Sequence, residues 1–172
     1  MSIDRLYRSK IIGVGGHLPD KVVTNDDLSK TLNTNDEWIT ERTGIKERRI
    51  VSENDTTSSL GIEAAKKAIN NAEINKDDID LIIVATATPD NTFPATATSI
   101  QSGLGIKKGY AYDVQAVCSG FVFGLELADN SISLGKSNTA LVIGSETFSR
   151  ILDWDDRSTC VLFGDGAGAV VL

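Results

Sequence analysis

Cys118 is the residue in this chain best suited to covalent chemistry. It lies between Asp113 and Phe121, where an apolar strand pattern gives way to a helical one. A helix N-terminus presents unpaired backbone N–H groups and a partial positive charge, and both favour a thiolate over a thiol. Because a thiolate is a strong nucleophile, this junction predicts an acyl-transfer enzyme. The competing interpretation is a buried structural cysteine, which is common for free cysteines.

A cationic segment stands out in an otherwise acidic chain. The eight residues from Arg42 to Arg49 include four cations, and Trp38 lies one helical turn before Arg42. An aromatic ring beside a guanidinium suits an adenine ring that carries phosphates. A solvated helix end with a half-buried tryptophan explains the same pattern without a ligand. Arg157, within a polar loop sequence, is a second isolated arginine.

Other motifs argue against a bound cofactor or metal. Residues 13–16 are glycine-rich but lack the third spaced glycine of a dinucleotide-binding loop. The glycine-rich run at residues 163–169 precedes a strand, so a tight turn is expected there. One histidine and two cysteines cannot form a standard zinc site, and no metal is predicted. His17 is interpreted as a loop histidine, and Cys160, in a β-like apolar run, as an inert core residue.

Strand patterns alternate with helical ones along the chain, which predicts an α/β fold with a mostly parallel five-stranded sheet and helices on both faces. The expected strands lie at 10–15, 81–85, 110–114, 139–144 and 167–172. The expected helices lie at about 24–32, 35–44 and 57–72, then from Pro94 to Leu104, and after Cys118 as far as Gly135.

The composition indicates a single globular unit of 172 residues, divided into a flexible segment at 1–9 and a domain at 10–172. A net charge of −7 argues against nucleic-acid binding. The sequence shows neither a secretory signal nor an apolar run of the ~20 residues that a membrane span needs. Two distant cysteines indicate a reducing cytoplasm. Because the chain ends in an apolar strand pattern, we expect it to be part of a longer protein.

Several segments together resemble β-ketoacyl-acyl carrier protein synthase III, and the resemblance is collinear from about Lys10 to Leu172. The matching segments are Asn35–Ile39, Arg42–Ile45, Asp113–Phe121, Asp156–Arg157 and Phe163–Ala169. The resemblance implies the thiolase fold, in which two similar α/β halves pack through central helices. This chain is similar to the N-terminal half.

The resemblance also implies a reaction. Cys118 would accept an acetyl group from acetyl-CoA, with its own N–H donating to the oxyanion, and malonyl-acyl carrier protein would then condense with the thioester. The product would be acetoacetyl-acyl carrier protein, the first intermediate of type II fatty acid synthesis. Acetyl-CoA is a substrate here, so no cofactor is implied. The catalytic His and Asn of the family have no match in this chain, so we expect the chain alone not to catalyse condensation.

The same resemblance assigns binding residues. Trp38 and Arg157 would sandwich the adenine of CoA, Thr34 would lie at the adenine pocket, and Arg42 near the phosphates. Phe93 would reach the acyl pocket of the partner subunit, in a homodimer formed through residues 110–114. The helix after Cys118 would expose Phe121, Leu125 and Ile132 unless another chain covers them. The alternative function is a non-catalytic scaffold fragment that dimerises or binds CoA.

Overall fold

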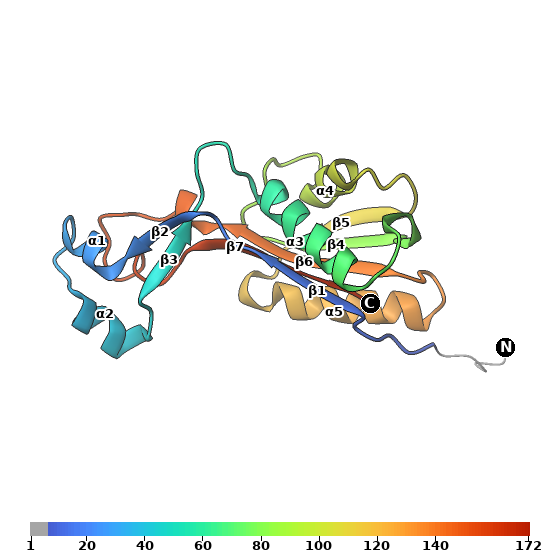
Figure 1. The fold of residues 1–172 in the computed structure, drawn as a ribbon, viewed down its shortest axis with the longest axis horizontal. Coiled ribbons are helices and arrows are strands. Elements are labelled where there is room, and N and C mark those ends of the chain that lie inside the picture. Colours follow the sequence, from blue (N-terminus) through green and yellow to red (C-terminus); the bar gives the residue numbers. More distant parts are fainter. Residues whose placement is uncertain (1–6) are drawn as a thin grey trace.

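A five-stranded mixed sheet forms the body of the molecule in the computed structural model, which describes residues 7–172 (Figure 1). The strand order is β1-β7-β6-β4-β5. The strands are β1 (Gly13–His17), β4 (Leu81–Ala85), β5 (Tyr110–Val114), β6 (Ala140–Thr147) and β7 (Asp165–Val171). All five expected strands are therefore present, although β1 begins three residues later than predicted. Of the segment expected to be flexible, 1–9, residues 1–6 lie outside the described residues.

The prediction of a mostly parallel sheet is wrong in its detail. Strand β4 pairs in parallel with β5 and β6, whereas β7 pairs antiparallel with both β6 and β1. The parallel pairs are joined through helices, but the chain passes from β6 to β7 through a loop with no crossover helix, so β7 returns beside β6 in the opposite direction. The glycine-rich run at 163–169 is mostly part of β7, so the tight turn expected there is absent.

Helices cover both faces of the sheet, as predicted. Helices α3 (Thr57–Asn71) and α4 (Thr96–Leu104) lie on one face, and α5 (Gly120–Ser133) lies on the other (Figure 1). Strand β4 is buried along its whole length because both layers contact it. Alternate residues of β4 belong to the two cores: Ile82 and Val84 pack with α3 and α4, and Leu81 and Ile83 pack with α5.

Two glycines of β1 explain the glycine-rich segment at 13–16. A Cβ atom at Gly15 would lie 2.3 Å from the Ala64 carbonyl oxygen, and one at Gly13 would lie 2.4 Å from the Ala68 carbonyl oxygen. Both carbonyls belong to α3, so the missing side chains allow the helix to rest directly on the strand. These glycines therefore serve helix packing, in agreement with the prediction that they form no dinucleotide loop.

A second unit, which we call the ribbon lobe, extends from one end of the sheet (Figure 1). It consists of the antiparallel pair β2 (Lys21–Thr24) and β3 (Glu47–Ile50), helices α1 (Asn25–Ser29) and α2 (Asp36–Thr43), and the loop at 151–164. Its apolar centre contains Leu28, Leu32, Ile39, Cys160 and Val161. Cys160 is a buried core residue, as predicted, but it lies in a series of turns and not in a β-like run.

The exposed face of α5 differs from the prediction. Phe121 and Leu125 are partly buried against the sheet and Ile132 is buried, because the sheet is the nearest apolar surface. Three other residues of the helix are exposed instead, namely Val122, Phe123 and Leu127. Within residues 7–172, no helix combines the length and the apolar character that crossing a membrane requires.

Candidate active site

Cys118 lies in a short 3₁₀ turn (Val117–Ser119) between β5 and α5, and its side chain is exposed. The Ser119 N–H donates to the Ala116 carbonyl (3.1 Å), and the Gly120 N–H donates to the Val117 carbonyl. Val117 has a positive φ of 48°, a conformation that is unfavourable for a β-branched residue. Strained backbone of this kind is concentrated at functional sites, where it aims a neighbouring side chain. The predicted nucleophile therefore occupies a sharp, exposed turn.

The turn is held at the carboxyl ends of three parallel strands. Ala85, at the end of β4, is in register with Val114 of β5 and Gly144 of β6. Helix α5 starts close to this edge because Gly120 faces Ala85, where an added Cβ would lie 3.1 Å from the Ala85 Cβ. In α/β sheets, ligands bind beyond the carboxyl ends of parallel strands. Cys118 thus lies where the topology places a site.

Asp113 connects the nucleophile strand to the segment that carries Phe93. Its two carboxylate oxygens accept hydrogen bonds from the N–H groups of Thr96 (2.8 Å) and Ala97 (2.7 Å), in the first turn of α4. The N-cap residue of α4, Ala95, has no side chain that could do this. Phe93, just before α4, is 83% exposed. The sequence motif containing Asp113 was recognised, but this capping role was missed because strand and helix are distant in sequence.

Glu146 is a second carboxylate at this edge that sequence reasoning missed. It accepts a hydrogen bond from the Ala87 N–H (2.7 Å) and from the hydroxyl of Thr88, both just beyond β4. The Thr88 hydroxyl oxygen also accepts from the Thr147 N–H (2.9 Å). These bonds fix the loop after β4 against the end of β6, at the same edge of the sheet.

The predicted nucleotide-binding residues meet in the ribbon lobe. The guanidinium carbon of Arg42 lies 4.4 Å from the centre of the Trp38 ring, and that of Arg157 lies 4.8 Å from it. Arg157 also donates to the carbonyl of Asn33. The neighbouring Thr34 hydroxyl is buried and has no hydrogen-bond partner within the described residues. We call Trp38, Arg42 and Arg157 the tryptophan clamp.

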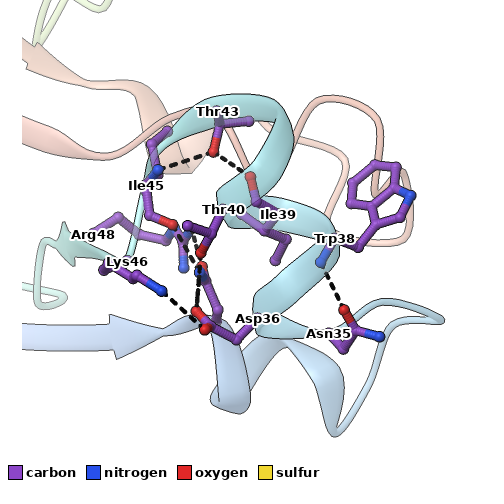
Figure 2. A network of polar contacts seen from close by, with 10 residues as sticks. Asn35, Asp36, Trp38, Ile39, Thr40, Thr43, Ile45, Lys46 and Arg48 are labelled. Carbon is purple, nitrogen blue, oxygen red and sulfur yellow. Dashed lines mark hydrogen bonds and ion pairs between the residues drawn. The ribbon is translucent and has the colours of Figure 1, made fainter.

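The local sequence explains why Trp38 is presented in this way. Asn35 caps α2, with its side chain accepting from the Trp38 N–H (2.7 Å), and Gly44 ends the helix with a φ of 73° (Figure 2). Arg42 follows Trp38 by one turn and donates to its carbonyl (3.2 Å). The cap, the stop and the shared face of Trp38 and Arg42 all agree with the prediction.

The other cations of residues 42–49 do not join one basic patch. Lys46 forms an ion pair with Asp36 (3.0 Å), and Arg49 pairs with Glu47 (3.7 Å). Arg48 is buried, and the bonds it makes are described below. The electrostatic surface offered to an anion in this segment is therefore narrower than the sequence suggested.

Cys118 and the tryptophan clamp lie in different parts of the molecule, the first on the sheet and the second in the ribbon lobe (Figure 1). A ligand that contacts both sites must be long. At one end it needs a group that stacks on an aromatic ring or binds a guanidinium, and at the other end it needs an electrophile. The structure thus separates the predicted nucleotide-binding residues from the predicted nucleophile.

Comparison with solved structures defines the class of fold. The chain superposes on 3-oxoacyl-[acyl-carrier-protein] synthase III from Aquifex aeolicus VF5 with a TM-score of 0.92 and 54% identity, over 94% of this chain and 52% of that one. It superposes on the priming β-ketosynthase of the R1128 polyketide pathway with a TM-score of 0.95 and 33% identity, over 99% and 51%. The chain therefore has the thiolase-like α/β fold of these synthases.

The sequence comparison is more specific. The family model described as 3-Oxoacyl-[acyl-carrier-protein (ACP)] synthase III matches residues 112–172. The β-ketoacyl-[acyl-carrier-protein] synthase III of Ehrlichia canis (strain Jake) is 62% identical over 167 residues, which are 97% of this chain and 52% of that protein. The resemblance to β-ketoacyl-acyl carrier protein synthase III is thereby confirmed. The chain spans about half the length of the curated relatives it matches.

Proposed function

We propose that this chain is the N-terminal half of a β-ketoacyl-acyl carrier protein synthase III that starts type II fatty acid synthesis. The observation that carries the proposal is the pairing of an exposed cysteine on a strained turn with an aromatic–guanidinium clamp elsewhere in the same chain. Such a pair suits a long thioester donor that carries a nucleotide. The high identity to synthase III relatives over nearly the whole chain supports the same substrate class.

The proposed first half-reaction is acyl transfer. The Cys118 thiolate attacks the thioester carbonyl carbon of acetyl-CoA, a new carbon–sulfur bond forms, and the bond to the CoA sulfur breaks. CoA leaves as a thiolate, which is then protonated. The turn's two hydrogen bonds use the N–H groups of Ser119 and Gly120, which leaves the Cys118 N–H available to donate to the developing oxyanion.

The proposed second half-reaction is a decarboxylative condensation. Malonyl-acyl carrier protein loses carbon dioxide, and the resulting enolate attacks the acetyl carbonyl and displaces the Cys118 thiolate, giving acetoacetyl-acyl carrier protein. The resemblance implies that the family's catalytic His and Asn, which stabilise that enolate, have no counterpart among the residues of this chain. We therefore assign acyl transfer to the residues of this chain and condensation to the whole protein.

Donor recognition is assigned to the tryptophan clamp. Adenine would insert between Trp38 and Arg157, with Arg42 near the phosphates, and the unpaired Thr34 hydroxyl would find a partner on the ligand. The guanidinium carbon of Arg157 lies 4.8 Å from the centre of the Trp38 ring, so the side chain must shift to admit the base. The proposal places the protein in the cytoplasm, with acetyl-CoA as a substrate and no cofactor.

A homodimer through β5 completes the proposal. Strand β5 is at the edge of the sheet, with stacked Tyr110 and Tyr112 rings 6.3 Å apart, and Tyr110 is 44% exposed. An edge strand with exposed aromatic residues suits pairing with a second copy. Phe93, exposed near the same edge, would reach the acyl pocket of the partner.

Intact-mass measurement after incubation with acetyl-CoA tests the proposal. We expect the chain to gain one acetyl group, the Cys118→Ala variant to gain none, and the Cys160→Ala variant to gain one. Cys160 is the matched control because its side chain is fully buried. A chain that binds CoA but gains no acetyl group would instead support the scaffold function. The tryptophan clamp lies within this chain, so CoA binding without catalysis also agrees with the structure. A chain that neither binds CoA nor accepts the acetyl group would contradict both.

A further inference from the structure

Arg48 is a buried cation whose partners are all neutral. Its side chain is on β3, 5% of the residue is exposed, and within residues 7–172 no carboxylate lies within ion-pair distance of it. Burial lowers the pKa of its guanidinium, and the Nε atom is buried without a hydrogen-bond partner. A buried, unpaired charge is costly, so its presence calls for a role beyond packing.

The guanidinium of Arg48 joins three separate segments of the ribbon lobe. It donates to the carbonyl of Val23 on β2 (3.2 Å), to the side-chain oxygen of Asn25 on α1 (2.8 Å) and to the carbonyl of Val161 in the loop at 151–164 (3.2 Å). Val161 and Arg48 are 113 positions apart in the sequence. One side chain therefore ties the loop that carries Arg157 to the ribbon.

Asn25 extends this connection to helix α2. Its side-chain nitrogen donates to the carboxylate of Asp36 (2.8 Å) and to the carbonyl of Ile45 (2.7 Å), at the two ends of the helix. Asp36 also accepts from Thr40 (3.2 Å) and Lys46. Asn25 is almost fully buried, so these bonds are shielded from water and correspondingly strong.

The hydrogen bonds of Arg48 and Asn25 end close in sequence to two residues of the tryptophan clamp, Trp38 and Arg157. Asp36 lies two residues before Trp38, and Val161 lies four residues after Arg157. We propose that Arg48, acting through Asn25, is a positioning residue that sets the spacing between Trp38 and Arg157 and thereby the affinity for the nucleotide end of the donor. The inference rests on the proposed function for its ligand, but the spacing itself can be measured without one.

The apolar centre of the lobe also holds α2 against the loop, since Ile39 packs in one cluster with Cys160 and Val161. Loss of Arg48 would then leave the ribbon lobe folded, but helix α2 and the loop at 151–164 would be held less precisely relative to each other. This distinguishes a positioning role from a purely structural one: geometry at Trp38 and nucleotide affinity change while the reactive turn, on the sheet, does not.

The test compares Arg48→Met, which keeps an unbranched apolar stem but removes the guanidinium and its donors, with Arg49→Met as a matched control. Arg49 is the next residue of β3 and bonds outside this network, to the Pro19 carbonyl and to Glu47. The first readout is the fluorine NMR resonance of Trp38 in 5-fluorotryptophan-labelled chain, assigned with a Trp38→Phe variant. The second is the CoA dissociation constant, and the third is acetylation of Cys118 by S-acetyl-N-acetylcysteamine, a donor without a nucleotide.

We expect Arg48→Met to move the Trp38 resonance toward its position in Arg157→Ala and to weaken CoA binding roughly tenfold, the order expected for losing one cation–aromatic contact. Acetylation by the nucleotide-free donor should stay within about twofold, because a change confined to the lobe leaves the transition state at the thiol unchanged. Arg49→Met should match the unmodified chain. If Arg48→Met does not fold, Asn25→Ser, which removes the amide nitrogen that donates to Asp36 and Ile45, takes its place with the same expectations.

Two results would overturn the inference. One is an unchanged Trp38 resonance and CoA affinity in a folded variant, and the other is a loss of acetylation by the nucleotide-free donor as large as the loss of CoA affinity. If the unmodified chain fails to bind CoA, the proposed function fails. The Trp38 resonance then decides the positioning role by itself, because it requires no ligand.

Discussion

The close contact between β1 and α3 allows us to predict how much Gly15→Ala lowers the stability of the fold. The added Cβ would lie 2.3 Å from the Ala64 carbonyl oxygen and 2.4 Å from the Ala68 backbone nitrogen, whereas ordinary van der Waals contact begins at 3.4 Å. Both obstacles are backbone atoms of the helix, so no side-chain rotation relieves them. The helix would have to retreat by about 1 Å, a gap that forfeits up to about half of the dispersion attraction at the contact.

We expect this substitution to lower the free energy of unfolding by about 2 to 4 kcal/mol, at or above the usual range for overpacking. For a chain of this size, that corresponds to a fall in melting temperature of roughly 5 to 15 °C. Thermal unfolding followed by circular dichroism measures it. Gly16→Ala is the matched control, because a Cβ there meets nothing closer than the Ala167 carbonyl at 3.7 Å.

The control should change stability by no more than about 1 kcal/mol, and in the stabilising direction if alanine suits the local backbone, since it reduces the freedom of the unfolded chain. Equal melting temperatures for Gly15→Ala and Gly16→Ala would refute the argument. That result would mean that α3 is not held at the distance described, and that the glycines of β1 serve some purpose other than close packing.

Three further predictions concern carboxylates and thiols. Asp113→Ala should lower the free energy of unfolding by about 1 to 2 kcal/mol through loss of the α4 cap, and Asp113→Asn, which keeps one acceptor, should lose less in the same urea titrations. A disulfide reagent should modify one thiol quickly, the exposed Cys118, and reach Cys160 only on unfolding, since it is fully buried and burial raises the pKa of its thiol. Burial raises the pKa of Asp80, but hydrogen bonds from residues 137–139 lower it by more, so the pKa of this carboxyl lies below the ordinary 3.8. The ionised carboxylate should therefore stabilise the fold above pH 3.8, and this contribution should be lost on acidification. The free energy of unfolding of the unmodified chain should therefore exceed that of Asp80→Ala by about 2 kcal/mol at pH 7, and urea titrations should show this gap closing toward pH 3.

Local patterns predicted the elements whose cause is local. The run Leu81–Ala85 matches β4 at both ends, because a strand covered on both faces is apolar throughout. Helix α2 was predicted within one residue at each end from its cap Asn35 and its stop Gly44. Thr24 and Asp27 form the capping box that the sequence suggested at the start of α1. These signals lie within a few residues of the structure that they determine.

Features that depend on distant contacts escaped prediction. Strands β2 and β3 have short, charged or mixed sequences, and they form because each pairs with the other across 20 or more residues of chain. The direction of β7 depends on how a long loop returns, which no local pattern encodes. Likewise, Arg48 looked like one of four surface cations, but the burial around it is created by Val161, far along the chain.

The site shows the same division. Motif resemblance assigned Trp38, Arg42, Arg157 and Thr34 to one site, and in the structure both arginines lie over the Trp38 ring while Arg157 bonds to Asn33, the residue before Thr34. Their role toward CoA stays a prediction, as does that of Cys118. The roles of the Asp113 and Glu146 carboxylates were missed, since each accepts from groups on a segment distant in sequence, and the backbone N–H groups among them carry no signature in a sequence.

The span of the clamp along the chain has a consequence for biosynthesis. Arg157 bonds to Asn33 across 124 positions, and the apolar centre of the lobe likewise needs Cys160 and Val161. A nascent chain emerging from the ribosome therefore displays Leu28 and Ile39 without their cover until nearly all of these residues have been translated. During that interval, about 10 s at ordinary rates of synthesis, the first-made end of the protein exposes apolar surface that chaperones bind and that favours aggregation.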